Sequence, residues 1–195
     1  MQIQEHNVTR IILLNGPRQV GKNFIADRYL ENASNARTLP VMWPGKLAAM
    51  AEYGVPPSVV EAMEFTKDAP HDMLCDLVGR KTPREVYIDY GERMRAEEGE
   101  AYFANAWVVH AAQLRHYDYI LVPDVRFQLE VDAASREFGQ HNVLLVRVRR
   151  QDYDWRLDIG SYCDHCCAAD FDNDVDASVD CPGLRLHETV RDLMP

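Results

Sequence analysis

Apolar residues gather in short runs that do not alternate with polar ones. The clearest are Arg10–Asn15 (RIILLN), Tyr117–Pro123 (YDYILVP) and Asn142–Val148 (NVLLVRV). A short apolar run bounded by turn residues is typical of a strand that is covered on both faces, as in a parallel sheet. Stretches of helical composition follow the first two runs, at Gly21–Leu30 and at Arg126–Phe138. This alternation predicts an α/β fold in which helices cover a parallel sheet.

The rest of the pattern predicts one domain with a core and an insert. The middle of the chain, about 44–115, is mostly helical in composition and contains no convincing strand. We expect it to form a helical insert that binds the acceptor, between core segments 8–43 and 116–195. Ala177–Val179 is predicted to be a last short strand, and Leu184–Leu193 a closing helix. A chain of 195 residues is long enough for a substantial core.

Charge and hydropathy narrow the function classes. The formal net charge is −10, from 21 Lys and Arg against 31 Asp and Glu. This balance disfavours a DNA-binding surface without excluding one, because neutralising phosphates needs clustered cations. Cationic residues do cluster, at 80–95 and 147–156, which suits a small anionic substrate. With no apolar run of about 20 residues and no signal-peptide pattern, we expect no membrane partner and a cytoplasmic location.

The cysteine count indicates free thiols. The chain holds five cysteines, an odd number, and without a secretory signal such residues are usually reduced. Residues 163–167 (CDHCC) could contribute zinc ligands, but structural zinc usually draws on two separated ligand pairs. We therefore expect a loop with free thiols there. The cysteines are Cys75, Cys163, Cys166, Cys167 and Cys181.

One motif carries most of the functional information. Residues 16–23 (GPRQVGKN) match G-x-x-x-x-G-K and lie between a predicted strand and a predicted helix. Such a loop turns backbone N–H groups toward phosphates, and its lysine reaches the β- and γ-phosphates. The motif predicts binding of ATP with Mg²⁺ by Gly16, Arg18, Gly21, Lys22 and Asn23. Asn23 stands where Ser or Thr is usual, so its amide oxygen would have to serve the metal.

A carboxylate on another strand completes the expected donor site. Asp124 ends a predicted buried strand, where ligands bind in parallel sheets, and is expected to be the second Mg²⁺ anchor. The structural alternative is a helix N-cap. For Arg126 and Glu130, a surface i, i+4 pair and an arginine facing the phosphates are equally supported. Arg150, in an expected lid at about 149–168, is predicted to neutralise the migrating phosphoryl group.

A helix in the insert is predicted to bind the acceptor. Thr82 followed by Pro-Arg-Glu is a strong helix start. At about 100° per residue, Arg84, Gly91 and Arg95 share one stripe of this helix. Arginines flanking a glycine leave space for a flat or phosphorylated ligand, so we expect substrate contact rather than solvated charge. The aromatic residues 102, 103 and 107 are expected in the core, with stacking on a base as the alternative.

These motifs resemble the phage deoxynucleoside monophosphate kinases and the related animal-type phosphomevalonate kinases. The similar segments are LLNGPRQVGKNF, WPGKLAAMAEYG, TPREVYIDYGERMR, VPDVRFQLEVDA and VDASVDCPG. The resemblance implies a P-loop NTPase fold, a nucleoside monophosphate kinase-like three-layer sandwich. It also implies ATP and Mg²⁺ as cofactors, with Lys46, Arg84, Arg95 and Arg126 near the acceptor and the phosphates. A phage-encoded chain would act in the host cytoplasm.

The function expected from sequence is ATP-dependent phosphorylation of a deoxynucleoside 5′-monophosphate to the diphosphate. The partner is thus a nucleotide or another small phosphorylated substrate, and a homodimer is compatible with the sequence. Alternative acceptors are a 5-hydroxymethylpyrimidine, in a nucleotide or in DNA, and phosphomevalonate. A nucleotide-dependent switch protein is the non-enzymatic alternative, which the expected acceptor helix argues against.

Overall fold

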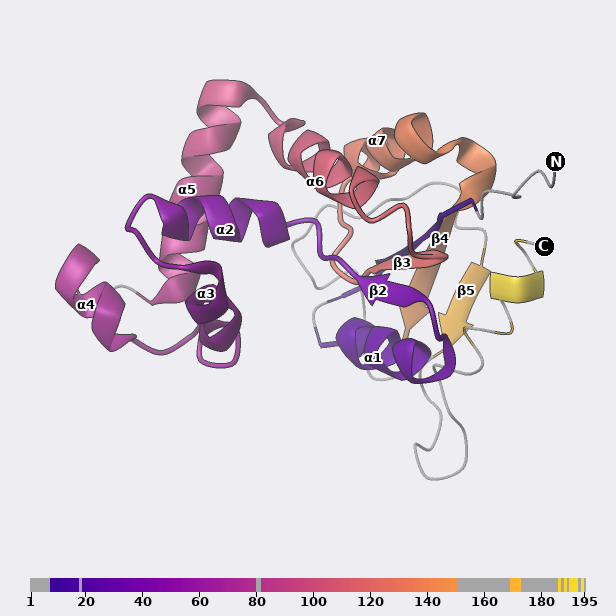
Figure 1. The fold of residues 1–195 in the computed structure, drawn as a ribbon, viewed down its shortest axis with the longest axis horizontal. Helices are drawn as coiled ribbons and strands as arrows, with labels where there is room; N and C mark the ends of the chain where they lie inside the picture. Colours follow the sequence, from indigo (N-terminus) through magenta and orange to yellow (C-terminus); the bar gives the residue numbers. More distant parts are fainter. Residues whose placement is uncertain are drawn as a thin grey trace, which may run out of the picture. The chain divides into compact units, whose positions relative to one another are not determined.

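The computed structural model describes residues 8–150 except 18, 80 and 81, together with 169–172, 186, 188, 190–192 and 194. Its strands form one five-stranded sheet in the order β2-β3-β1-β4-β5 (Figure 1). Every neighbouring pair runs parallel. The strands are β1 (Arg10–Asn15), β2 (Ala36–Thr38), β3 (Tyr119–Val122), β4 (Val143–Arg149) and β5 (Ala169–Asp172).

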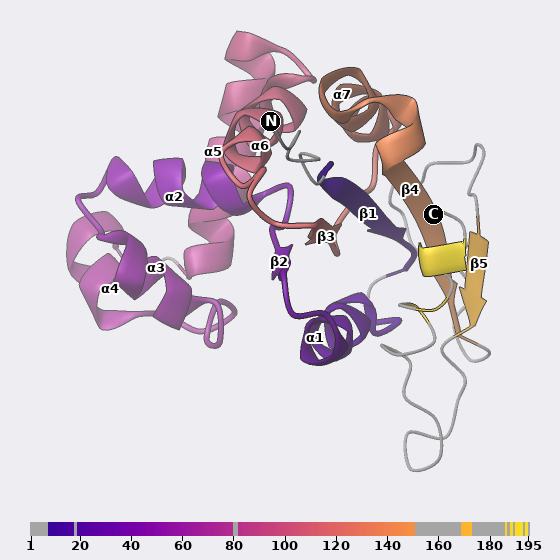
Figure 2. The same ribbon diagram turned by 45° about the vertical axis from the view of Figure 1, so that its right-hand side comes forward.

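Helices cover both faces of this sheet. Figures 1 and 2 show α1 (Lys22–Asn32) on one face and α7 (Gln128–Phe138) on the other. The central strand β1 is buried along residues 11–15, because both of its faces meet helices. The helical residues described near the C-terminus extend this core, since Leu186 and Val190 are fully buried in the same apolar cluster as α1. Burial of both faces explains why the strands read as continuous apolar runs.

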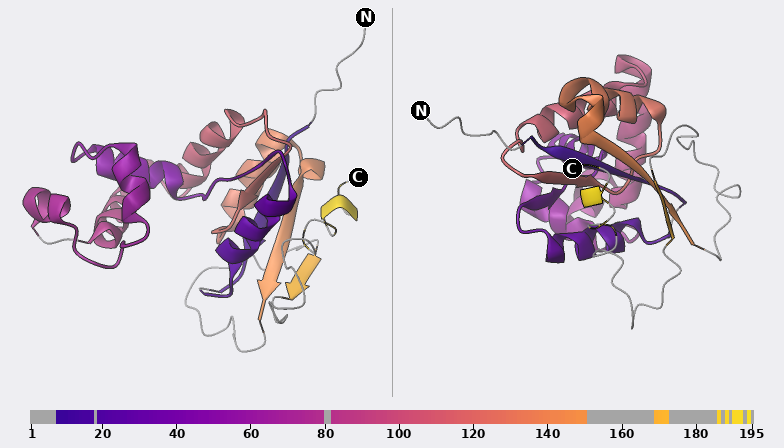
Figure 3. Two further views of the ribbon diagram at one scale, coloured as in Figure 1. Left: turned by 60° about the horizontal axis from the view of Figure 1, so that its bottom comes forward. Right: turned by 90° about the vertical axis from the view of Figure 1, so that its right-hand side faces the viewer.

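The chain divides into two compact units, which are described separately. Unit 1 comprises 1–41 and 108–195, and unit 2 comprises 42–107. Every helix or strand described in unit 2 is a helix, and α6 begins in this unit and continues into unit 1 (Figure 3). Its helices are α2 (Trp43–Ala51), α3 (Pro57–Met63), α4 (Asp72–Val78), α5 (Pro83–Glu98) and the first part of α6 (Tyr102–Ala112).

Helix α5 begins as its sequence predicts. The Thr82 hydroxyl accepts a hydrogen bond from the Glu85 N–H, and the Glu85 carboxylate accepts one from the Thr82 N–H. This reciprocal pair satisfies N–H groups that the first turn leaves without helical partners. Gly45 brings α2 close to α6, because a Cβ there would lie 2.5 Å from the Phe103 ring. Phe103 and Trp107 are buried, as expected for core residues.

The structure corrects several predicted elements. Strands β2 and β5 have no counterpart among the predicted elements. Strand β2 is short and partly exposed and has no apolar run, and β5 contains a single aromatic residue between acidic ones. Helix α7 begins at Gln128 rather than at Arg126. The predicted strand 177–179 and the 163–167 cysteine cluster lie outside the described residues. Within the described part, no helix is long and apolar enough to cross a membrane.

Candidate functional site

The carboxyl ends of the parallel strands bring separate loops to one edge of unit 1. The loop after β1 starts at Gly16, the loop after β3 contains Asp124, and Arg150 directly follows β4. The loop after β2 joins them through a hydrogen bond, in which the Val41 N–H donates to Asp124 Oδ1 at 2.7 Å. Gly16, Asp124 and Arg150 therefore lie at the sheet edge where ligands bind in open α/β sheets.

The glycines of the 16–23 loop hold conformations that a side chain would not tolerate. Gly16 has φ +151° and packs so tightly that a Cβ would lie 2.5 Å from the Val148 carbonyl oxygen. Gly21 has φ +98° in the left-handed region and forms the N-cap of α1. Gln19, at φ +64°, also lies in the left-handed region. Backbone held in such rare conformations is common where a loop encloses a ligand.

Lys22 is folded over this loop at the first position of α1. Its ammonium donates hydrogen bonds to the carbonyl oxygens of Gly16 (2.6 Å) and Pro17 (2.7 Å). No side chain caps α1, whose first turn also contains Asn23, an exposed residue. The loop therefore combines a positive charge with the N–H groups of a helix N-terminus, which together bind phosphate. Arg18 lies outside the described residues.

Hydrogen bonds that involve side chains hold residues 124–127 of the loop that follows β3. Beside the Val41–Asp124 bond, the buried Asn15 Nδ2 donates to the Val125 carbonyl at 3.0 Å. Glu130 Oε2 accepts from the N–H groups of Arg126 (2.7 Å) and Phe127 (3.1 Å). Asn15 directly precedes Gly16, so it ties the loop bearing Asp124 to the start of the glycine loop.

Glu130 is a buried acid with an altered pKa. Its side chain is 6% exposed, and this burial raises the pKa to about 7, with a further increase from the Asp124 charge. The N–H groups of Arg126 and Phe127 oppose the increase because they stabilise the carboxylate. The N-cap of α7 is Phe127, and Glu130 accepts the N–H groups of Arg126 and Phe127 at this end of the helix. The N-cap interpretation of Asp124 is therefore wrong.

Arg126 and Glu130 are not arranged as a pair on the surface of a helix. Arg126 precedes α7 and is exposed, while Glu130 is buried and binds the Arg126 backbone. The prediction of an i, i+4 pair on the helix surface is therefore wrong. Glu130 instead holds the backbone of Arg126 through its N–H group. Arg150 is exposed at the end of β4, and the predicted lid beyond it, 151–168, lies outside the described residues.

The oxygen donors at this edge fit Mg²⁺. Asp124 supplies a carboxylate whose Oδ1 is oriented by a backbone N–H, and Asn23 supplies an amide oxygen on α1. No cluster of three or more His, Cys, Asp or Glu suited to a metal occurs among the described residues. Mg²⁺ matches such a sparse set because it usually keeps waters and substrate phosphates as ligands and takes only one or two protein carboxylates.

The predicted acceptor residues lie together in unit 2, and most are engaged by neighbours. Lys46 Nζ is 2.6 Å from Glu64 Oε2. Arg84 is paired with Asp68 in two hydrogen bonds, which raise the pKa of the guanidinium. Arg95 instead lies over the Phe103 ring, with its Cζ 5.1 Å from the ring centre.

Gly91 adjoins Arg95 on the same face of α5. A Cβ at Gly91 would lie 3.6 Å from Arg95 Nη1, an ordinary contact distance. Among the described residues no carboxylate lies within 4.0 Å of the Arg95 guanidinium. Arg95 is thus the predicted acceptor residue whose charge is least neutralised within unit 2.

The five strands form a parallel sheet, and the glycine loop and Lys22 lie between β1 and α1. With helices on both faces of the sheet, the fold is α/β. No known protein family matches the sequence, and no curated protein sequence does either. Among solved structures, the chain is similar to shikimate kinase from Bacteroides thetaiotaomicron, with a TM-score of 0.44 and 10% identity over 93% of this chain and 98% of that one. A similarity this weak carries no argument about activity.

Some residues of these sites can be recognised only by their partners in the fold. Asn15 ends a predicted strand, and its position just before the glycine loop is the one signal in the sequence for its bond to Val125. Glu64, which binds Lys46, gives no signal, because a lone Glu in a helical segment carries no pattern.

Proposed function

We propose that this protein is an ATP-dependent kinase whose acceptor is a deoxynucleoside 5′-monophosphate, which it converts to the diphosphate. The observation that carries the proposal is the glycine loop of unit 1. Gly16 and Gly21 open the loop backbone, and Lys22 lies over it. Asp124 stands at the same sheet edge. These are the components that phosphoryl transfer from ATP requires.

The proposed reaction is an in-line displacement at the γ-phosphorus. An oxygen of the acceptor phosphate forms the new O–P bond, while the bond to the β-phosphate oxygen breaks and ADP leaves. Lys22 and the glycine-loop N–H groups hold the β- and γ-phosphates, and Arg126 and Arg150 neutralise the charge that spreads over the phosphoryl oxygens. Asp124 and Asn23 would hold Mg²⁺, which supplies further charge neutralisation on the phosphates. The acceptor is already an anion, so no strong general base is needed.

We propose that unit 2 is the acceptor-binding insert of a single kinase domain. Its support is Arg95 on α5, which carries a charge that no described carboxylate neutralises. Gly91 is buried beside Arg95 and Phe103, and its lack of a side chain lets the Arg95 guanidinium lie close to the helix backbone. A phosphate bound there would form charge-assisted hydrogen bonds, which are about twice as strong as neutral ones.

Phosphoryl transfer from labelled ATP tests the proposal directly. The acceptor panel contains the four common deoxynucleoside 5′-monophosphates, 5-hydroxymethyl-dCMP, phosphomevalonate, and plain or hydroxymethylated DNA. We expect transfer to at least one monophosphate, and a loss of several orders of magnitude in the Lys22→Ala variant with its fold retained. ATP binding without transfer to any acceptor would favour the switch protein. Transfer by Lys22→Ala at the wild-type rate would remove the assignment of the glycine loop.

A further inference from the structure

The pairing of β1 with β3 ends before the strands reach the candidate donor site. Its last pair is Leu13 with Val122, and the next residue, Pro123, has no N–H with which to continue a ladder. On its other side, β1 stays paired with β4 as far as Asn15. The backbone of Asn15 is therefore held by β4, while the segment that carries Asp124 extends past the last pair between β1 and β3.

The side chain of Asn15 connects the two strands beyond the end of this pairing. Its Nδ2 donates to the Val125 carbonyl oxygen at 3.0 Å. Asn15 is 1% exposed and Val125 is fully buried, so the bond is shielded from competing water. Leaving a buried acceptor without its donor is unfavourable, and the bond therefore holds Val125 at a fixed distance from β1.

Val125 lies between two residues that the proposed reaction uses, Asp124 and Arg126. The Val41 N–H donates to Asp124 Oδ1 at 2.7 Å, which attaches the segment to the loop after β2. The Arg126 N–H donates to Glu130 Oε2 at 2.7 Å, which attaches it to α7. The bond to Val125 differs from both, because it comes from the strand that leads directly into the glycine loop.

We propose that Asn15 is a positioning residue that holds Asp124 in register with the glycine loop, so that ATP and Mg²⁺ bind as one complex. The inference rests on the proposed function and extends it to how the two parts of the donor site are aligned. Because Gly16 directly follows Asn15, the side-chain bond fixes the distance between the metal-binding carboxylate and the loop that holds the phosphates. An asparagine suits this role because its amide donates to a carbonyl, whereas an ionised carboxylate has no proton to donate.

Calorimetric titration of the full chain with AMP-PNP, a non-hydrolysable ATP analogue, tests the proposal through binding rather than activity. Each protein is titrated with excess Mg²⁺ and with EDTA, and the ratio of the two affinities measures how far the metal strengthens nucleotide binding. Asn15→Leu keeps a branched side chain and lacks the donor. We expect it to lower this ratio about tenfold, as loss of a residue that orients a metal ligand does, and to change the affinity in EDTA less than about threefold.

Asn142 provides a matched control at the amino ends of the strands. It directly precedes β4, and its Nδ2 donates to the Phe138 carbonyl oxygen at 2.8 Å in a buried bond. Asn142→Leu therefore removes the same kind of bond far from the donor site. It should lower the melting temperature and leave the affinity ratio as in wild type. Asn15→Ala, which introduces no clash, supplies the same comparison if Asn15→Leu fails to fold.

A double variant shows whether Asn15 acts through Asp124. In the Asp124→Asn background, Asn15→Leu should lower the ratio less than about twofold, because the carboxylate that it positions is gone. A wild-type ratio in both Asn15→Leu and Asn15→Ala would overturn the proposal. An equal fall in Asn142→Leu, or the full loss on top of Asp124→Asn, would do the same.

The outcomes separate this inference from the proposed function. Phosphoryl transfer to a monophosphate, with a wild-type affinity ratio in Asn15→Leu, would leave a kinase and overturn the positioning role. Metal-strengthened nucleotide binding that depends on Asn15, with no transfer to any acceptor, would support the positioning role and refute the kinase.

Discussion

Replacing Glu130 by glutamine removes the charge of a buried side chain and keeps an oxygen that can accept the N–H groups of Arg126 and Phe127. In the wild type, burial raises the Glu130 pKa from its ordinary 4.5 to about 7. The charged groups that act on it are Asp124, which raises the pKa, and Arg126, which lowers it. The variant therefore isolates the penalty for ionising this one carboxyl in the folded protein.

The sign follows from proton binding in the two states. Below about pH 4.5 the carboxyl is protonated in both, so it adds no pH dependence. Between 4.5 and about 7 the folded state keeps a proton that the unfolded state has lost, and stability falls as pH rises. Above about 7 both states are ionised and the effect is constant. Carrying the pKa over this interval corresponds to a loss of about 3 kcal/mol.

The assay is urea unfolding of wild type and Glu130→Gln, without nucleotide or metal, at pH 5, 6, 7 and 8. Other titrating groups cancel in the difference between the two proteins. Relative to the wild type, the free energy of unfolding of the variant should rise by about 2.5 kcal/mol between pH 5 and pH 8, since part of the effect already develops below pH 5. A difference that is constant across this range would refute the reasoning, because it would show that Glu130 titrates normally in the folded state.

Other substitutions test the metal, the acceptor and the packing. Asp124→Asn should raise the Mg²⁺ concentration needed for half-maximal rate, since an amide is a poorer ligand. Unchanged metal dependence with a lower melting temperature would show that Asp124 acts only by accepting the Val41 N–H. Arg95→Ala should raise the acceptor KM about tenfold to a hundredfold and leave the ATP KM nearly unchanged; an unchanged acceptor KM would place the acceptor elsewhere. Gly45→Ala should destabilise the protein by about 1–3 kcal/mol, because the new Cβ meets the Phe103 ring. Gly91→Ala, whose new Cβ would meet Arg95 and Phe103 only at ordinary contact distances, should stabilise it by up to about 1 kcal/mol, and equal melting temperatures would contradict both.

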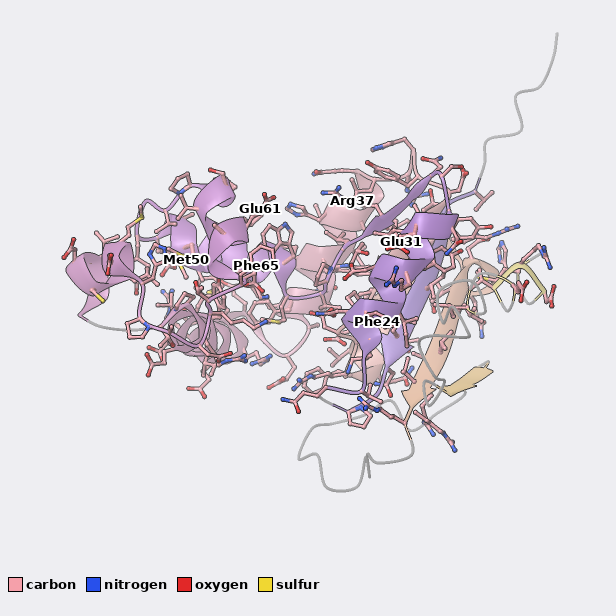
Figure 4. The ribbon with its side chains drawn as sticks, turned by 90° about the horizontal axis from the view of Figure 1, so that it is seen from below. Phe24, Glu31, Arg37, Met50, Glu61 and Phe65 are labelled. Carbon is pink, nitrogen blue, oxygen red and sulfur yellow. The ribbon has the colours of Figure 1, made fainter. Side chains whose placement is uncertain are left out.

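The outer surface of α1 illustrates how far local pattern predicts structure. Phe24 and Glu31 lie on its exposed side in Figure 4, and Phe24 is 42% exposed. Arg28, one turn after Phe24, lies over its ring with Cζ 5.3 Å from the centre. Such i, i+4 neighbours follow from helical spacing. The partly exposed Phe24 shows that an apolar residue in a predicted helix need not face the core.

By itself the sequence determined the central strands, the glycine loop and the strand-end position of Asp124. Strands β1, β3 and β4 are apolar on both faces, and helices of ordinary composition follow β1 and β3. The spacing of Gly16, Gly21 and Lys22 is a local property, because one turn of backbone and the first turn of α1 contain all of it. Such features can be predicted from the sequence because they depend on residues only a few positions apart.

Only the tertiary structure decided which side chains complete the site. The bond between Val41 and Asp124 joins residues 83 positions apart, and that between Asn15 and Val125 joins residues 110 apart. The short strand β2 forms because β3 offers it an edge, not because of its own composition. Burial of Glu130 likewise depends on packing that no local pattern encodes. Long-range contacts set these roles, since burial and hydrogen-bond partners are properties of the folded chain rather than of residue type.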